Sequence, residues 1–507
     1  MQKFLLIACL LTSAFISQSY AADSKTKSSK KATIEELAPY DDSWKTSFPG
    51  SSPAFAEKSA KAMGEQEKRR KVASDMDQEF FEGKMSKEMK AFRELFLKVK
   101  TAEELDKLLA EADKNFDSYP ADLQFIVAQA VPLRAFRGIV WKLIPTVEDS
   151  KTAHSLILTQ VKNMAVNMKI FLPTEQWQAG FDYVSQPYME PATGSLSQQF
   201  PRGSEVHVQA FIRNTVIPAL RISAARMEKI NLSGDFAVWD NKLLYGNGSF
   251  PSAMDRYALF GEVERHTALM YTYANLSELC YQSAYSQQGA LKLNQEIARL
   301  YGWDSVLSKV DGVPAAKRVK TIRSPAYAQW GVLFGDGTKW TQDAWMFMQR
   351  SVDHGDQMWQ AMKNRPVSEI YMADSSAALP FQRPVNMRFE NLKKMMDGPT
   401  AIRSFVTDEK ATVNLKEFYM NPPKDLKAMY AIGFDKESEM LTKTLGNNSK
   451  VQYRNYFHGR GTEWNIGLYK KYFPDVQSSQ DLLKTAKVLS QGWGSFVVAV
   501  PLANYLN

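Results

Sequence analysis

Apolar residues recur at helical spacing along most of the chain, and this spacing constrains the fold more than any other feature. A capping box at Thr101–Glu104 opens a segment whose apolar residues share one helix face. Segments such as "LQFIVAQAVPL" are apolar nearly all round, which is typical of helices inside a bundle. We therefore predict an all-α fold with minor β hairpins, built as stacked helical hairpins or a multi-helix bundle in two packed helical domains.

The segment "WMFMQRSVDHGDQMWQAM" carries a longer apolar seam that is rich in methionine. Thioethers suit Cu(I), but the periodicity favours methionines that fill gaps in a core. On the other side of this helix, Asp353, His354 and Asp356 are predicted to form a polar surface. Alternating steps of three and four residues place on the core-facing side Trp345, Met348, Val352, Gly355, Trp359 and Met362.

Proline, glycine and charge divide the chain into segments. The predicted divisions are a signal peptide at 1–21, a flexible basic linker at 22–52, an N-terminal helical domain at 53–184, a linker at 185–204 and a C-terminal, mainly helical domain at 205–507.

Within these domains, proline also sets the predicted helix ends. Pro145 and Pro173 divide helices expected at about 121–144, 152–170 and 175–184, and Pro218 should kink the helix that starts at Glu205. A short hairpin is predicted near 235–246, pairing 236–239 with 242–245, and a second within 403–418. Further helices are predicted at about 252–300, 341–363, 385–397, 424–445 and 480–490.

The first residues have the order of a secretory signal peptide. Lys3 precedes the apolar run Phe4–Ile16, and the small residues near 19–21 place cleavage after Ala21. Leu6–Cys9 also fits a lipidation motif, but only five apolar residues precede its cysteine, fewer than the roughly 7–15 of an h-region. An uncleaved anchor would need an apolar run of about 18 residues. We expect an exported, soluble, periplasmic or secreted protein with no transmembrane segment in the mature chain.

The number of cysteines and the net charge of the chain are consistent with export and indicate which class of partner to expect. Cleavage leaves Cys280 as the single cysteine, in a helical context that predicts a buried core position. The formal net charge is +8, and part of the excess lies in the basic segment "ADSKTKSSKK". This modest excess is typical of a solvated surface that net charge keeps soluble. As partners outside the cytoplasm, an anionic cell-wall or lipid surface or an envelope protein is favoured over nucleic acid.

The usual motifs of metal, nucleotide and hydrolase chemistry do not occur. No HExxH, Walker A, GxGxxG or GxSxG pattern is present, so we predict no metal site and no cofactor. Glu262 and His266 stand four residues apart on a helix, as two metal ligands can. His266 also lies in line with Leu259, Val263 and Met270, which favours a partly buried histidine in an apolar stripe.

The segment "YRNYFHGRGTEWNIGLY" at 453–469 is the candidate site for chemistry. Sugars are bound by aromatic faces and a few charged groups, and a glutamate against an apolar wall can act as a general acid. Catalytic candidates are therefore His458, Arg460 and Glu463, and ligand-binding candidates are Tyr456 and Trp464. The alternative is a glycine-rich turn in which arginine stacks on aromatic rings.

These observations support two functional hypotheses. The first is an exported, soluble helical binding or scaffold protein of a bacterial envelope that contacts cell-wall or other anionic envelope components. The alternative is a cell-wall glycan-active enzyme with a site around 453–469.

Overall fold

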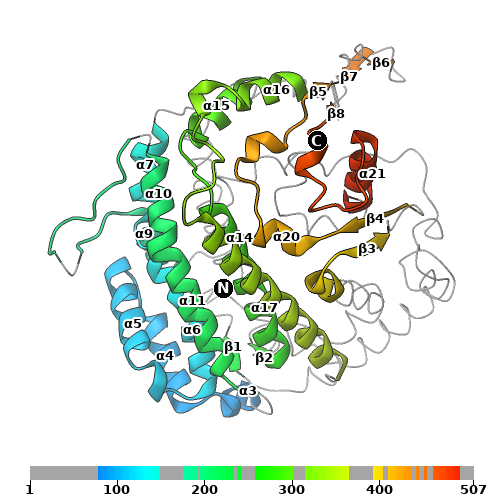
Figure 1. Cartoon of the computed structure of the whole chain (residues 1–507). Helices are drawn as coiled ribbons and strands as arrows, with labels where there is room; N and C mark the ends of the chain where they lie inside the picture. Colours follow the sequence, from blue (N-terminus) through cyan, green and yellow to red (C-terminus); the bar gives the residue numbers. More distant parts are fainter. Residues whose placement is uncertain are drawn as a thin grey trace.

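The structure, a computed structural model, is mostly helical with a few short strand pairs, which confirms the predicted fold class (Figure 1). The predicted signal peptide, the basic linker and the helix predicted at 152–170 lie outside the described residues. The structure describes residues 78–148, 175–190, 193–202, 204–232, 237–240, 257–300, 315–364, 392–403, 409–434, 441–444, 450–453 and 461–490.

Two long helices, α14 (Glu262–Ser283) and α17 (Gly337–Asn364), pack side by side at the centre of the fold. Residue numbers rise along α14 as they fall along α17, so the helices are antiparallel. The contacts that show this are His266 with His354, Met270 with Ser351, and Tyr273 with Phe347. The predicted α17 seam is confirmed, since its members Trp345, Val352 and Trp359 are all buried.

A layer of shorter helices covers one side of this pair, coloured blue to green in Figure 1. The predicted capping box is present at the start of α5. Helix α11 lies between α6 and α14 and contacts both. The members of the layer are α3 (Gln78–Lys84), α4 (Lys87–Leu97), α5 (Ala102–Lys114), α6 (Ala121–Ala135), α7 (Ile139–Glu148), α9 (Glu175–Ser185), α10 (Glu205–Phe211) and α11 (Ile217–Lys229).

The break between α6 and α7 differs from the predicted one. A single helix over 121–144 ending at Pro145 was expected, but Gly138, with φ at +63°, separates the two helices. Pro145 lies inside α7, where it cannot donate to the carbonyl of Trp141 four residues earlier. The Gln199 side chain fills that role, because its Nε2 donates to Trp141 O at 3.2 Å.

Pro132 is accommodated inside α6 in the same way. Its missing N–H leaves the carbonyl of Ala128 without its helical donor. Ser223 of α11, which is 1% exposed, donates its hydroxyl to Ala128 O at 2.8 Å. A contact between two helices thus replaces a hydrogen bond within one helix.

The α10–α11 segment is irregular where a kink was predicted. A π-helical turn at Ile212–Val216 directly precedes Pro218, which lies in the first turn of α11. The described part of 185–204 packs on α7, since Lys142 Nζ donates to Tyr188 Oη at 3.0 Å and Trp141 Nε1 donates to Ser197 O at 3.2 Å. The division into two domains joined by this loop stays a prediction.

The first predicted hairpin has a different second strand. β1 (Ala237–Asp240) lies in the predicted segment, but it pairs antiparallel with β2 (Tyr257–Phe260), where helix was expected. The predicted partner at 242–245 lies outside the described residues. A four-residue apolar run such as "YALF" does not distinguish a buried strand from a helix turn.

A hairpin is present near the second predicted one but begins earlier, as β3 (Thr400–Arg403) pairs with β4 (Lys410–Val413). The end of the predicted segment is helical instead and belongs to α20 (Leu415–Met420). The helix predicted at 424–445 is wrong. Its backbone bonds to a distant segment, since Leu426 N donates to Gly331 O and Leu333 N donates to Lys424 O, both at 2.9 Å. These contacts override the helix-forming composition of "DLKAMYAI".

The remaining elements lie above and to the right of α14 and α17 in Figure 1. The helix predicted at 480–490 is confirmed as α21. These elements are α15 (Ala290–Leu300), α16 (Ala315–Ile322), α20 (Leu415–Met420), β5 (Gly433–Phe434) paired with β8 (Gly461–Glu463), β6 (Leu441–Thr444) paired with β7 (Lys450–Tyr453), and α21 (Ser479–Ser490).

Among the described residues, one helical stretch is long and apolar enough to cross a membrane. This is Ala121–Pro145, with a mean hydropathy of 1.2 and 61% of its apolar window buried inside the protein. An interior helix of a water-soluble protein has the same length and composition. The stretch therefore carries no conclusion about a membrane.

The hydrogen bond from Ser223 of α11 to Ala128 O of α6 predicts that the effects of substituting Ser223 and Pro132 on stability depend on each other. Ser223→Ala should lower the free energy of unfolding by about 1–3 kcal/mol, because it leaves a buried carbonyl without a donor. In a Pro132→Ala background the restored N–H of residue 132 can bond to Ala128 O. Ser223→Ala should therefore lower the free energy of unfolding by at least about 0.5 kcal/mol less in this background than in the wild type. Chemical denaturation of the wild type, the two single variants and the double variant measures this difference. Equal costs in both backgrounds would contradict the assigned role of Ser223.

Candidate functional site

The segment predicted from sequence as a site is only partly described. Tyr456, His458 and Arg460 lie outside the described residues. Glu463 is exposed on β8, and its backbone pairs with Gly433 of β5. Trp464 is 3% exposed and packs in the hydrophobic core. The catalytic and ligand-binding roles of these five residues stay predictions.

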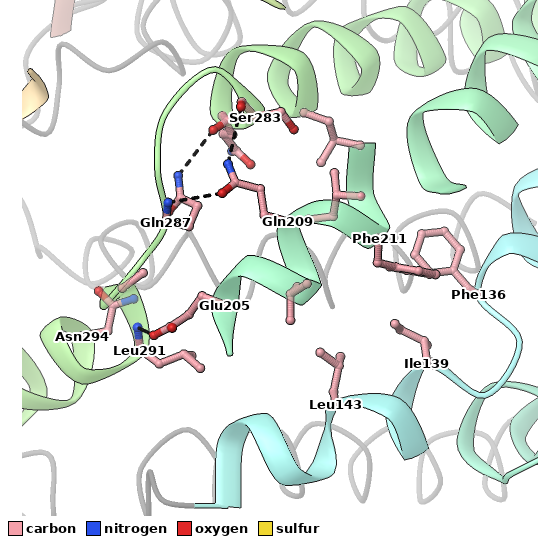
Figure 2. A pocket seen from close by; sticks show the side chains of 15 residues that line it. Phe136, Ile139, Leu143, Glu205, Gln209, Phe211, Ser283, Gln287, Leu291 and Asn294 are labelled. Carbon is pink, nitrogen blue, oxygen red and sulfur yellow. Dashed lines mark hydrogen bonds between the residues drawn. The ribbon is translucent and has the colours of Figure 1, made fainter. Parts of the chain in front are cut away.

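A large apolar pocket opens between α7, α10, α14 and α15 and encloses about 850 Å³, part of it open to solvent. Its polar groups come from Glu205, Gln209, Gln282, Ser283, Gln287 and Asn294 (Figure 2). Its apolar wall is formed by Phe136, Ile139, Leu143, Val208, Phe211, Ile212, Leu279, Ala290 and Leu291. The wall combines segments that are up to 155 positions apart in the chain, counted from Phe136 to Leu291.

Gln209 fixes the polar side of the pocket. Its side chain is 6% exposed, and Nε2 donates to the carbonyl of Tyr285 at 2.6 Å and to that of Ser283 at 3.4 Å. Its Oε1 accepts from Gln287 N at 3.4 Å (Figure 2). The amide therefore ties α10 to the loop that follows α14, and its hydrogen-bonding groups are already engaged.

Glu205 is the charged residue of the pocket lining. It lies in the first turn of α10, and its Oε1 accepts from Leu291 N at 3.0 Å. Leu291 belongs to the first turn of α15, where backbone N–H groups lack helical acceptors. The carboxylate thus joins the starts of two helices and is held at one end of the pocket.

None of the residues predicted as a site from the sequence lines this pocket. Glu205, Val208, Gln209 and Ile212 do share one face of the predicted helix, at spacings of three and four residues. A polar pair within an apolar face is a local signal, but the residues opposite it come from three other helices. No spacing along the chain brings those helices together.

A pair of buried histidines forms a second polar cluster, between α14 and α17. His266 and His354 are 8% and 7% exposed, and their Nδ1 atoms lie 3.0 Å apart. Their rings stack with centroids 5.3 Å apart, and Tyr273 stacks on His354 at 5.6 Å. The predicted partly buried state of His266 is confirmed. The predicted surface position of His354 is wrong, because its side chain points towards α14 instead of solvent.

The neighbours of the pair offer both donors and acceptors. Arg265 Nη2 lies 3.2 Å from His266 Nε2. His354 Nε2 lies 3.5 Å from Glu228 Oε1 without forming a hydrogen bond. Tyr273 Oη donates to the same oxygen at 2.7 Å.

This arrangement favours a neutral imidazole at His354. Burial lowers the pKa of His354, and the neighbouring His266 lowers it further, against the opposing effect of Glu228. Glu262 also flanks the pair, with its Oε2 3.4 Å from His266 Nε2. This cluster, the histidine relay, joins α14, α17 and α11.

Cys280 is buried in the core at 0% exposure, as predicted. Burial raises the pKa of its thiol to about 12, so at neutral pH it is a protonated, unreactive group. In the described part of the chain, no three His, Cys, Asp or Glu side chains converge to hold a metal ion.

Comparison with protein-family models, with curated proteins and with solved structures finds no match to this chain.

The histidine relay predicts a loss of stability on acidification. The folded pKa of His354 is lowered, so below the unfolded value of about 6.5 the unfolded chain binds a proton that the folded chain excludes. Stability should fall as the pH drops from about 6.5 towards the folded pKa. His354→Gln should lower the melting temperature at pH 7.5 but make its decline to pH 5 shallower.

The exposed His207 on α10 provides the control. His207→Gln should keep the wild-type pH profile of the melting temperature. A profile for His354→Gln that is as steep as that of the wild type would contradict a neutral, buried His354.

Proposed function

We propose that this protein is an exported, non-catalytic helical binding protein whose pocket between α7, α10, α14 and α15 holds an apolar ligand. The observation that carries the proposal is the pocket, with a mainly apolar wall and a small set of polar groups at defined positions. Binding sites for small molecules have this composition.

The state of the polar groups favours binding over chemistry. General acid–base chemistry commonly combines titratable groups within hydrogen-bond reach of the substrate, and Glu205 is the single titratable residue of this lining. The amide of Gln209 is bonded to backbone carbonyls and to Gln287 N, and Oε1 of Glu205 is bonded to the start of α15. These contacts keep the pocket in shape before a ligand arrives, which lowers the entropic cost of binding.

Export and contact with the envelope are supported by the sequence. The signal-like first 21 residues and the lysine-rich segment after them are typical of a protein that meets an anionic surface outside the cytoplasm. Sedimentation with purified cell-wall sacculi at low and high salt tests this part of the proposal. Retention that is lost at high salt supports an anionic surface, and no retention at low salt argues against a cell-wall partner.

A pair of valines on α10 allows a sharp test of the pocket. Val208 lines the pocket, whereas Val206 is 54% exposed on the same helix. Val208→Trp should fill the pocket and weaken binding of the neutral apolar dye Nile red by at least about tenfold, which corresponds to 1.4 kcal/mol. Val206→Trp should leave the affinity within about twofold.

Fluorescence titration with Nile red measures both affinities, and melting temperatures show whether each variant is folded. Equal weakening by both tryptophans, or no weakening by Val208→Trp, would contradict this pocket as the ligand site.

A further inference from the structure

We propose that the pocket selects an elongated apolar molecule whose polar end donates hydrogen bonds and carries no negative charge, with that end at Glu205. This inference rests on the proposed binding function and adds the chemical class of the ligand. The class is a cationic amphiphile, such as an alkyl chain that ends in an amine.

The charge of the lining is the first argument. Of the residues that line the pocket, Glu205 carries a formal charge, and it is negative; the remaining polar members are amides and one serine. An anionic head group entering this space would lose its hydration and face a carboxylate without a lining cation to compensate. An ammonium group at the same place would gain a charge-assisted hydrogen bond.

The free acceptor of Glu205 is the second argument. Leu291 N bonds to Oε1, and within the described part of the chain no hydrogen bond to Oε2 occurs. Gln209 cannot play this part, because its Oε1 and Nε2 are both engaged with the chain after α14. Oε2 of Glu205 is therefore the acceptor that a ligand can reach.

The shape of the pocket gives the orientation. Glu205 and Asn294 lie at one end in Figure 2, and Phe136 and Phe211 lie at the other. Asn294 is exposed and Glu205 is half-buried, whereas Phe136 is only 5% exposed. The polar end is thus the mouth, and Phe136 with Ile139 forms the deep apolar end. A chain entering tail first would lie along α10 and leave its head beside Glu205.

Competition among three amphiphiles with the same chain length tests this proposal. Dodecylamine, dodecanol and laurate, each below its micelle concentration at pH 7.5, compete with Nile red for the full-length protein after removal of residues 1–21. We expect dodecylamine to bind most tightly, dodecanol next, and laurate at least about tenfold more weakly than the amine.

Glu205→Gln assigns the preference to one residue. Glutamine keeps an acceptor for Leu291 N, so the start of α15 stays bonded. The variant should lose about tenfold in affinity for dodecylamine, gain affinity for laurate, and keep dodecanol within about twofold. Glu103→Gln on α5, which is exposed, makes the same change in net charge away from the pocket and should alter none of the three affinities.

The possible outcomes test the proposed ligand class and the proposed binding function separately. If laurate competes as well as dodecylamine with the wild type, or if Glu205→Gln leaves their ratio unchanged, the selection by charge is overturned while the apolar pocket stands. If the wild type binds neither Nile red nor any of the three amphiphiles, as checked by calorimetry, the proposed binding function fails and the ligand class with it.

Discussion

The antiparallel contact between α14 and α17 is the interaction on which the rest of the structure depends. It buries aromatic rings and histidines along its length, and Ser351 of α17 donates its hydroxyl to the carbonyl of Met270 at 2.9 Å inside the contact. The first half of α14 supplies His266 to the relay, and its last turns supply Leu279 and Ser283 to the pocket. Both polar clusters are thus anchored on one helix, and a helix is stiff enough to hold side chains at its two ends in fixed positions.

Helices with an internal proline depend on their neighbours. Pro132 and Pro145 each free a carbonyl that a side chain from another segment then bonds, Ser223 in one case and Gln199 in the other. A buried carbonyl without a donor costs about as much as a lost hydrogen bond. The apolar helices α6 and α7 therefore reach their stable form only when α11 and the 193–202 segment are in place, which favours cooperative folding of this region.

The two polar clusters use their hydrogen bonds differently. In the relay, the two Nδ1 atoms face each other and Arg265 lies against His266 Nε2, whereas His354 Nε2 lies 3.5 Å from Glu228 Oε1 without forming a hydrogen bond. In the pocket, Gln209 is engaged but Glu205 retains a free oxygen at the mouth. The first arrangement locks helices together, and the second leaves one acceptor for a ligand.

The sequence by itself determined the elements whose evidence is local. The helical spacing of apolar residues predicted the buried α17 seam, the capping box predicted the start of α5, and Pro218 predicted the irregular turn before α11. Each of these signals lies within one element, because capping and periodicity act over a few residues.

Only the tertiary structure decided which elements meet. It paired β1 with β2, replaced the expected helix at 424–445 by backbone contacts to 331–333, and turned His354 towards His266. It also assembled the pocket from α7, α10, α14 and α15. The physical reason is that the free energy of such contacts comes from burial and hydrogen bonding between segments far apart in the chain, and no local period encodes the choice of partner.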